Sequence, residues 1–316
     1  MGARLVGMLA LVALVALPPL LPKYHLEVLI SIVFWAYLGI AWNILGGYAG
    51  QFSFGHAAYF GIGAYASTLL LLRAGLSPWL GMVLGGALAA AFGLFQGYLS
   101  FRYGLKGPYF SLVTLAFAEM LRVVAVNTKA VGSSLGLVVP TTQEAARLFI
   151  FAGKLPYYYI ILVMGALALA LTWKIERSRL GFSLAAVREN EDAAETAGVD
   201  ALGTKLRAMA LSSFLTALGG TFYAQYFAYI DPTITFGPSV SIGALLPAIV
   251  GGAGTVLGPV LGSFVLTPLS ELTRSALRGR AGADIMLYGA VLVLVISFLP
   301  QGIMGFVRER RMRGRA

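Results

Sequence analysis

The chain contains no cysteine, which excludes disulfide bonds, thiolate metal sites and thiol catalysis. Charge is also scarce: 11% of the 316 residues are charged, whereas a soluble domain carries about a quarter. The only histidines are His25 and His56, and the sequence has no HExxH zinc motif, no Walker lysine loop and no EF-hand loop. These absences leave an enzyme poorly supported, and we expect this chain to bind no metal and no cofactor of its own.

Apolar residues predominate in the composition. They make up 59% of the chain, and the mean hydropathy is +0.83. We therefore predict an all-α polytopic membrane protein, with residues 1–316 forming a single transmembrane domain of about 8–10 helices at about 20 residues each. The net charge of +10 fits the Lys and Arg of cytoplasmic loops and tails, so it does not indicate nucleic-acid binding.

Apolar runs mark the expected spans, and polar segments separate them. A signal peptide is the rival interpretation of the first run, but no small-residue cleavage site precedes Pro22 and Lys23. The expected spans are 4–21, 26–45, a run that ends near 72, 79–101, 108–126, 155–172, 206–229 and 284–299.

Two Gly-rich interruptions lie in the two halves of the chain, at 46–63 and 251–262. A continuous ideal helix is disfavoured where glycines cluster in this way. Paired interruptions point to a transport pathway built from discontinuous helices, and the alternative is close helix packing through small residues. We predict that the first interruption lines a substrate pathway. The pathway residues are Gly50, Gln51, Ser53, Gly55 and His56.

Charge parity constrains the topology. The tail at 306–316 carries five arginines between Arg308 and Arg315, and we expect it to be cytoplasmic, together with the N-terminus. Segment 241–268, which contains Pro247 and several glycines, must then cross the membrane twice or not at all. A re-entrant hairpin and a pair of short helices both satisfy this condition, whereas a single span does not.

The one strongly charged segment is the loop at 174–205, which is too polar for hydrocarbon and is expected in the cytoplasm. Its interior predicts a helix that begins at an N-cap Ser183 and ends near Gly198. The small residues Ala186, Ala193 and Ala197 would share one face and fit a shallow groove on another protein. The alternative is a solvated connector without a partner.

Few polar side chains are expected at membrane depth. Glu119 and Arg122 stand three apart on one predicted helix and can form an ion pair, which we interpret as structural. His56 either stabilises the exposed backbone of the first interruption or contacts a ligand. The full set is Asn43, Gln51, Ser53, His56, Ser111, Thr114, Glu119, Arg122, Gln225 and Thr267.

Four stretches together resemble the permease subunits of branched-chain amino acid ABC importers, and more closely the LivM type. They cover nearly the whole chain in the family's order. The stretches are GYAGQFSFGHAAYFGIGAY (47–65), KGPYFSLVTLAFAEMLR (106–122), RLGFSLAAVRENEDAAETAGVD (179–200) and GGAGTVLGPVLGSFV (251–265).

The resemblance implies an inner-membrane subunit with alternating access. Its implied partners are a second homologous permease, two ATP-binding ATPases and a periplasmic substrate-binding protein. The charged loop would dock on an ATPase, although it reads Asp192-Ala193-Ala194-Glu195 where many importers carry Glu-Ala-Ala. The implied coupling residues are Arg188, Glu189, Asn190, Asp192, Ala193, Ala194 and Gly198.

The cargo is less specified than the class of transporter. Members of the family also carry urea and short amides, so these remain alternative substrates. A secondary transporter or channel is the other alternative. It is expected to need coupling-ion carboxylates at the membrane midplane, and Glu119 is the only candidate.

Overall fold

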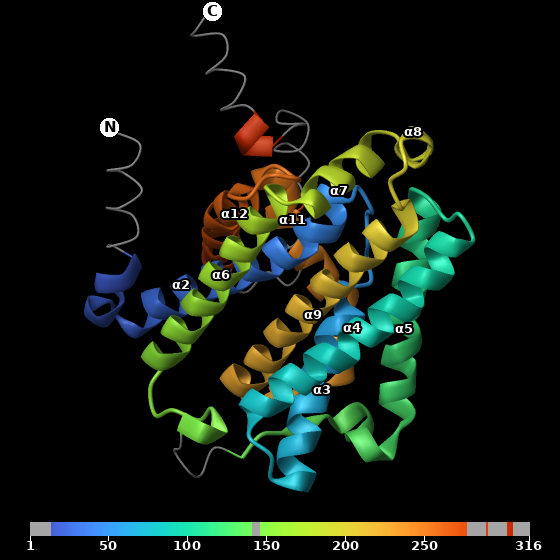
Figure 1. Cartoon of the computed structure of the whole chain (residues 1–316). Coiled ribbons are helices and arrows are strands. Elements are labelled where there is room, and N and C mark those ends of the chain that lie inside the picture. Colours follow the sequence, from blue (N-terminus) through green and yellow to red (C-terminus); the bar gives the residue numbers. More distant parts are fainter. Residues whose placement is uncertain (1–13, 141–145, 277–288, 290–301, 306–316) are drawn as a thin grey trace, which may run out of the picture.

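Helices make up almost the whole of the computed structural model, which describes residues 14–140, 146–276, 289 and 302–305 (Figure 1). Among these residues, six helical segments are long and apolar enough to cross a membrane. The prediction of an all-α polytopic membrane protein is therefore confirmed. The expected first span at 4–21 falls mostly, and the last at 284–299 almost entirely, outside the described residues.

The helices follow the apolar runs closely, because each run is bounded by a proline, glycine or charged residue. In chain order they are α2 (Lys23–Asn43) with its π-helical extension η2 (Ile44–Tyr48), α3 (His56–Ala74), α4 (Pro78–Arg102), α5 (Pro108–Asn127), α6 (Leu155–Glu176), α7 (Arg179–Glu189), α8 (Glu191–Thr196), α9 (Ala201–Phe227), α10 (Pro232–Thr235), α11 (Pro238–Gly251) and α12 (Gly258–Ala276).

Helix α9 lies at the centre although it is not among the six apolar segments. It packs along both α3 and α4. Its buried hydroxyls explain its lower hydropathy, and they are satisfied by carbonyls: Ser213 Oγ donates to Met209 O at 2.7 Å, and Thr216 Oγ1 donates to Ser212 O at 2.8 Å. Hydrogen-bonded hydroxyls of this kind are tolerated inside a membrane bundle.

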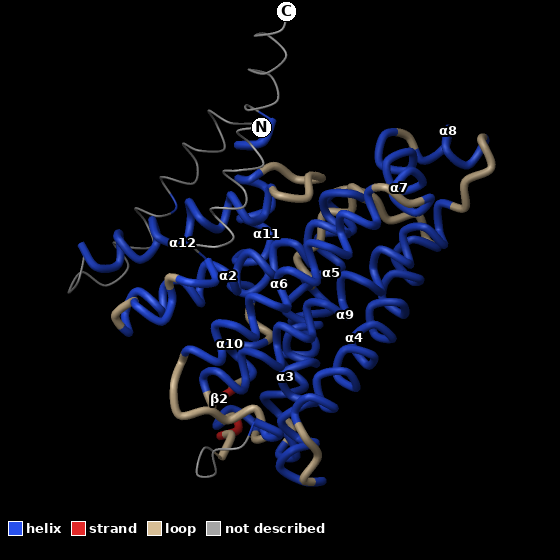
Figure 2. Tube along the Cα trace, turned by 60° about the vertical axis from the view of Figure 1, so that its left-hand side comes forward, coloured by secondary structure: helices blue, strands red, loops and turns tan. Residues whose placement is uncertain are grey.

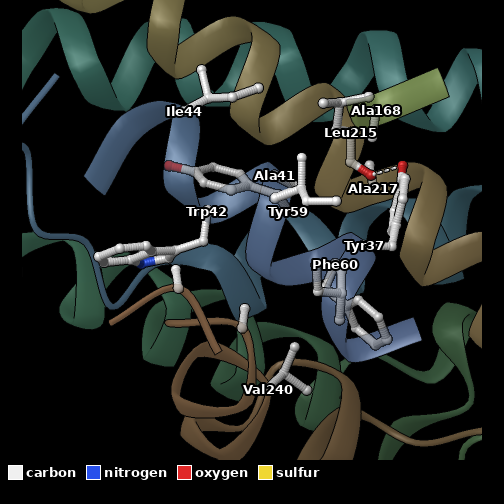
Figure 3. Close-up of a cluster of buried hydrophobic side chains, with 14 of the residues drawn as sticks. Tyr37, Ala41, Trp42, Ile44, Tyr59, Phe60, Ala168, Leu215, Ala217 and Val240 are labelled. Atoms are coloured by element: carbon white, nitrogen blue, oxygen red, sulfur yellow. Dashed lines mark hydrogen bonds between the residues drawn. The ribbon is translucent and has the colours of Figure 1, made fainter. Parts of the chain in front are cut away.

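The apolar core forms where α2 crosses α3 and α9. Figure 3 shows the buried aromatic side chains of this crossing, among them Tyr37, Trp42 and Tyr59. Tyr37 is buried but keeps its polar end satisfied, because its hydroxyl donates to the Leu215 carbonyl at 2.6 Å. Buried aromatics with a satisfied polar end hold the crossing together.

The two ends of the bundle differ in character (Figure 2). One end carries α7 and α8, and the opposite end carries the pairing of β1 (Leu137–Val138) with β2 (Tyr229–Ile230). At that second end the Trp79 and Phe149 rings stack with centroids 4.3 Å apart. The short helical turns of the chain are η1 (Pro18–Leu20), η3 (Lys129–Val131), η4 (Ser133–Leu135) and η5 (Ala146–Leu148).

Segment 241–268 is not one helix. Helices α11 and α12 pack against each other, and the turn between them contains Gly254 and Thr255. The predicted interruption is confirmed. The number of times this segment crosses the membrane stays a prediction.

The predicted helix from Ser183 to Gly198 is wrong. The helix α7 begins five residues earlier, because Ser178 is the cap and its hydroxyl accepts from the Gly181 N–H. The chain then breaks at Asn190, whose side chain accepts from the Ala193 N–H and caps the separate helix α8. Two short helices with a corner between them therefore replace one amphipathic helix, and the predicted stripe of alanines is divided.

Glycine spacing sets how closely α3 and α9 approach. A Cβ on Gly63 would lie 2.0 Å from the Ala217 carbonyl oxygen, whereas a Cβ on Gly165 would meet nothing closer than Val33 at 3.7 Å. We expect Gly63→Ala to destabilise the bundle by at least about 1–3 kcal/mol through overpacking. Thermal unfolding of the purified protein in detergent measures this, with Gly165→Ala as the matched control. Equal midpoints for the two variants would contradict the packing argument.

Candidate functional site

The first Gly-rich interruption is an unwound stretch, residues 49–55, between η2 and α3. Its backbone groups bond to side chains of neighbouring helices. The Trp42 indole N–H donates to the Ser53 carbonyl at 2.9 Å, and the Ser111 hydroxyl of α5 donates to the Phe52 carbonyl at 2.7 Å. Unwound backbone at membrane depth requires such partners, because lipid offers none.

The last part of the stretch is held from two sides. The Phe54 N–H donates to Thr114 Oγ1 of α5 at 3.1 Å, and its carbonyl accepts from the Ser241 hydroxyl of α11 at 2.6 Å. Ser241 Oγ also accepts from the Ala57 N–H at 2.9 Å. Ser111 and Thr114 were visible in the sequence as polar residues at membrane depth, but nothing there indicated their partners, and Ser241 gave no signal.

The two Gly-rich interruptions meet in space. Asn43, which is buried at the end of α2, donates from Nδ2 to the Thr255 carbonyl at 2.9 Å. Its Oδ1 accepts from the Gly254 N–H at 2.8 Å. Gly47 allows this approach, since a Cβ there would lie 2.5 Å from the Gly254 nitrogen. One amide side chain thus fastens the turn between α11 and α12 to the interruption that follows α2.

Arg188 of α7 reaches the same place. Its Nη1 donates to the Gly47 carbonyl at 2.7 Å, and its Cγ lies 3.0 Å from where a Cβ on Gly50 would be. The helix α7 is thereby attached to both interruptions. We call this meeting point the glycine junction. It consists of Asn43, Gly47, Arg188, Gly254 and Thr255.

A cavity of about 230 Å³ adjoins the glycine junction. Charged side chains from α6 and α7 share its wall with small and aromatic residues, so it is suited to water or a small polar molecule. The residues that line it are Tyr48, Glu176, Gly181, Phe182, Ala185, Arg188, Glu189 and Gly254.

The five predicted pathway residues fall into two groups. Gly50 is exposed with φ of +67°, a conformation that favours glycine, and Gln51 is half-buried beside it. The Gln51 amide donates to the Ala49 carbonyl at 3.2 Å. Gly50 lies next to Arg188, so this end of the unwound stretch borders the glycine junction.

Ser53, Gly55 and His56 are fully enclosed by neighbouring helices. A Cβ on Gly55 would lie 2.9 Å from Thr114, so this glycine permits close packing on α5. The ring Nε2 of His56 lies 2.8 Å from Ser212 Oγ, which itself donates to a backbone carbonyl of α2. In this conformation the three residues connect helices and do not face open space.

Helices α7 and α8, which we call the α7–α8 hairpin, share a small apolar cluster with the start of α9. Val187, Ala194 and Ala201 form this cluster, and Val199 packs against it. Ala194, a predicted coupling residue, therefore faces inward. The other six predicted coupling residues are exposed on the hairpin: Arg188, Glu189, Asn190, Asp192, Ala193 and Gly198.

Glu191 anchors the hairpin to the membrane helices. Its carboxylate pairs with Lys205 at the start of α9, whose side chain is only 3% exposed, and with Lys106 at 3.2 Å from the loop before α5. Partial burial raises the pKa of the Glu191 carboxyl, but the two ammonium groups lower it further, so the net pKa is below its usual value. Nothing in the sequence indicated this three-residue contact, since opposite charges are common throughout the loop.

Glu119 and Arg122 do form an ion pair on α5, with Arg122 Nε 2.7 Å from Glu119 Oε2. Both side chains are about one-third exposed, at 37% and 31%. The pair therefore lies neither in the core nor fully on the surface. Elsewhere in the described part of the chain, no three or more His, Asp or Glu side chains gather where they could hold a metal ion.

A comparison with known proteins identifies the family to which the chain belongs. A family model described as "Branched-chain amino acid transport system / permease component" matches residues 24–296. The chain belongs to this family. The match covers the glycine junction, the α7–α8 hairpin and the Glu119–Arg122 pair alike.

Individual members of the family are distant in sequence. The chain is 26% identical over 324 residues to the high-affinity branched-chain amino acid transport system permease protein LivM of Escherichia coli, covering 95% of this chain and 74% of that protein. It is 24% identical to LivH of the same organism, covering 86% of this chain and 91% of LivH. A probable LivH of Methanocaldococcus jannaschii is 25% identical, covering 80% and 82%. No solved structure matches.

The buried lysine is expected to hold the hairpin more strongly than the exposed one. Lys205→Met removes the enclosed partner of Glu191, whereas Lys106→Met removes a partner whose side chain is 56% exposed. We expect faster hydrogen exchange over 189–200 in Lys205→Met, by about tenfold or more, and little change in Lys106→Met. A larger effect of Lys106→Met would contradict this assignment.

The same contact predicts a pH dependence. The pKa of Glu191 is lower in the folded than in the unfolded state. The ionised carboxylate therefore stabilises the hairpin fully at pH values above the unfolded pKa of about 4.3, and this stabilisation is lost as the pH falls through the folded pKa. Protection from exchange over 189–200 in the wild type, with each rate divided by the intrinsic rate at that pH, should therefore fall below about pH 4.3 and approach that of Lys205→Met.

Proposed function

We propose that this chain is a permease subunit of an ATP-driven importer for branched-chain amino acids in the inner membrane. It pairs with a second, homologous permease, and separate ATPase subunits drive it from the cytoplasm. A periplasmic binding protein delivers the cargo. Family membership supports the class of transporter, and the names of the relatives favour branched-chain amino acids over urea or short amides.

The proposed contact with the ATPase rests on the exposure of the α7–α8 hairpin. The hairpin protrudes at one end of the bundle (Figure 1), and its anchored base leaves Asp192 and Ala193 exposed on the surface. The sequence offers no phosphate-binding loop, so the driving energy must come from another chain. A small side chain at a helical corner suits close seating in a groove, and the adjoining carboxylates set orientation through charge.

Arg188 supplies the route from the hairpin to the membrane part. Its guanidinium bonds to the Gly47 carbonyl, and the Asn43 side chain continues the connection to the turn between α11 and α12. A displacement of α7 would therefore act on both Gly-rich interruptions at once. In this proposal, ATP-driven movement of the hairpin changes the glycine junction and opens or closes the path beside Gly50 and Gln51.

Orientation follows from the same proposal. The hairpin end faces the cytoplasm together with both termini, and the end with β1 and β2 faces the periplasm. The charged content of the hairpin and the five arginines at 308–315 support this assignment.

A bulky residue on the hairpin tests the docking. Ala193→Trp adds volume at an exposed corner, so the fold should persist while ATPase binding is blocked. We expect ATPase subunits to be lost on purification and import of labelled leucine to fall by at least about tenfold. Ala193→Ser, which keeps a small side chain, should behave as the wild type. Retention of the ATPases and full import in Ala193→Trp would reject this docking site.

Removal of the Arg188 contact tests the coupling separately. Arg188→Ala deletes the charge-assisted bond to the Gly47 carbonyl, a contact worth about 1.5–3 kcal/mol. We expect complexes that retain ATPase subunits and hydrolyse ATP but import leucine about tenfold or more slowly per ATP. Arg179→Ala removes an exposed charge from the same helix and serves as the control. An unchanged ratio of import to hydrolysis in Arg188→Ala would contradict the proposed route.

A further inference from the structure

Glu119 lies near the middle of helix α5, and Arg122 lies about one turn closer to its C-terminal end. Helix α5 has 20 residues, so it is about 30 Å long, which matches the hydrocarbon thickness. Glu119 is reached about 17 Å from the start of the helix at 1.5 Å per residue. A charged pair at this depth is costly unless protein or water covers it.

The pair occupies one flank of α5. Phe110, Thr114 and Ala118 mark the buried side, and Leu112 and Met120 mark the outward apolar side, with exposures of 63% and 47%. The opposite flank of α5 packs against α4, because the Phe117 ring contacts the rings of Phe92 and Phe95. Glu119 and Arg122 are therefore turned away from α4 and lie between the core and the outward apolar side. Helix α5 itself stands at the edge of the bundle in Figure 1.

The flank of α5 that carries the pair also contacts the unwound stretch, residues 49–55. Ser111, Leu115, Glu119 and Arg122 follow at spacings of four, four and three, so they form one stripe along the helix. At the N-terminal end of the stripe, Ser111 bonds to the Phe52 carbonyl of the unwound stretch. The charged pair thus lies on the same stripe of α5 as the contact with the Gly-rich interruption, about two to three turns further along the helix.

Both head groups have unused hydrogen-bonding capacity within the described part of the chain. The bond between them uses Arg122 Nε and Glu119 Oε2. The terminal guanidinium nitrogens of Arg122 and the Oε1 oxygen of Glu119 bond to no other described residue. A guanidinium can bind a carboxylate through two parallel bonds, and a carboxylate oxygen can accept from an ammonium group.

We propose that Glu119 and Arg122 form a transient binding site for a zwitterionic amino acid on the transport path. The cargo carboxylate bonds to the terminal nitrogens of Arg122, and the cargo ammonium bonds to Glu119. This inference rests on the proposed function and specifies how the permease recognises the class of its cargo.

Import by the complete complex tests this site. Liposomes would hold this chain, its partner permease and the ATPases, with the binding protein and labelled leucine outside. Glu119→Gln and Arg122→Gln should each reduce the import rate by about tenfold or more, since each removes charge-assisted bonds. Glu271→Gln is the matched control, because Glu271 and Arg274 form another pair at the same spacing, 3.7 Å apart on α12. Wild-type rates in both α5 variants would overturn the proposal.

Cysteine protection separates binding from a structural role. The chain has no cysteine, so Leu115→Cys introduces a single thiol one turn from Glu119 and leaves the pair intact. We expect a water-soluble thiol reagent to modify it in the assembled complex, and leucine to slow the modification. Met120→Cys, on the outward apolar side, should resist the reagent. An unreactive Leu115→Cys, or one that leucine does not protect, would mean that the pair is structural, for example within the contact between the two permeases.

The outcomes distinguish this inference from the function on which it rests. If the wild-type complex imports no leucine, the proposed function fails. If the wild type imports leucine while the α5 variants match it, only the zwitterion site fails. Complex yield and thermal midpoint are measured for every variant, so a loss of import in a variant that does not assemble is not counted as support; the Leu115→Cys result then decides.

Discussion

Unwound backbone inside a membrane bundle must find its hydrogen-bond partners within the protein, and much of this structure follows from that requirement. Residues 49–55 expose peptide groups at a depth where lipid cannot satisfy them. Trp42, Ser111, Thr114 and Ser241 supply the partners from three different helices. The interruption therefore fixes the relative positions of α2, α5 and α11, in addition to breaking the helix.

The same requirement links the interruption to the surface. Backbone carbonyls at the end of η2 have no helical partner beyond the break, and the Gly47 carbonyl accepts from Arg188 of α7. A charged side chain from the water-exposed hairpin thus satisfies a backbone group of the membrane part. Movement of the hairpin cannot leave the break unaffected, because it would leave that carbonyl without its partner. In the proposed function, this shared hydrogen bond is the physical basis of coupling.

Local patterns predicted much of the fold, and tertiary partners account for the rest. Hydropathy and glycine clustering depend only on neighbouring residues, so the spans and both interruptions were predictable. The meeting of Asn43 with Gly254 joins residues more than 200 positions apart, and no local signal specifies it. The helix within the charged loop failed for a different reason: Ser178 and Ser183 are both acceptable caps, and burial of Leu184 and Val187 selects the first. Asn190 followed by two acidic residues was a usable signal for the start of α8.

A path with few charges imposes a limit on the affinity of any site along it. An isolated buried arginine or glutamate would bind an oppositely charged group too strongly for rapid release, and either would be costly in the empty state. A Glu119–Arg122 pair compensates itself when no cargo is present. At the proposed site, a zwitterion replaces the charge-assisted bond between Glu119 and Arg122 with charge-assisted bonds to itself. The net free energy of binding is therefore small. In the proposed function, weak binding of this kind suits a permease whose cargo must leave on the other side, and tight recognition belongs to the proposed binding protein.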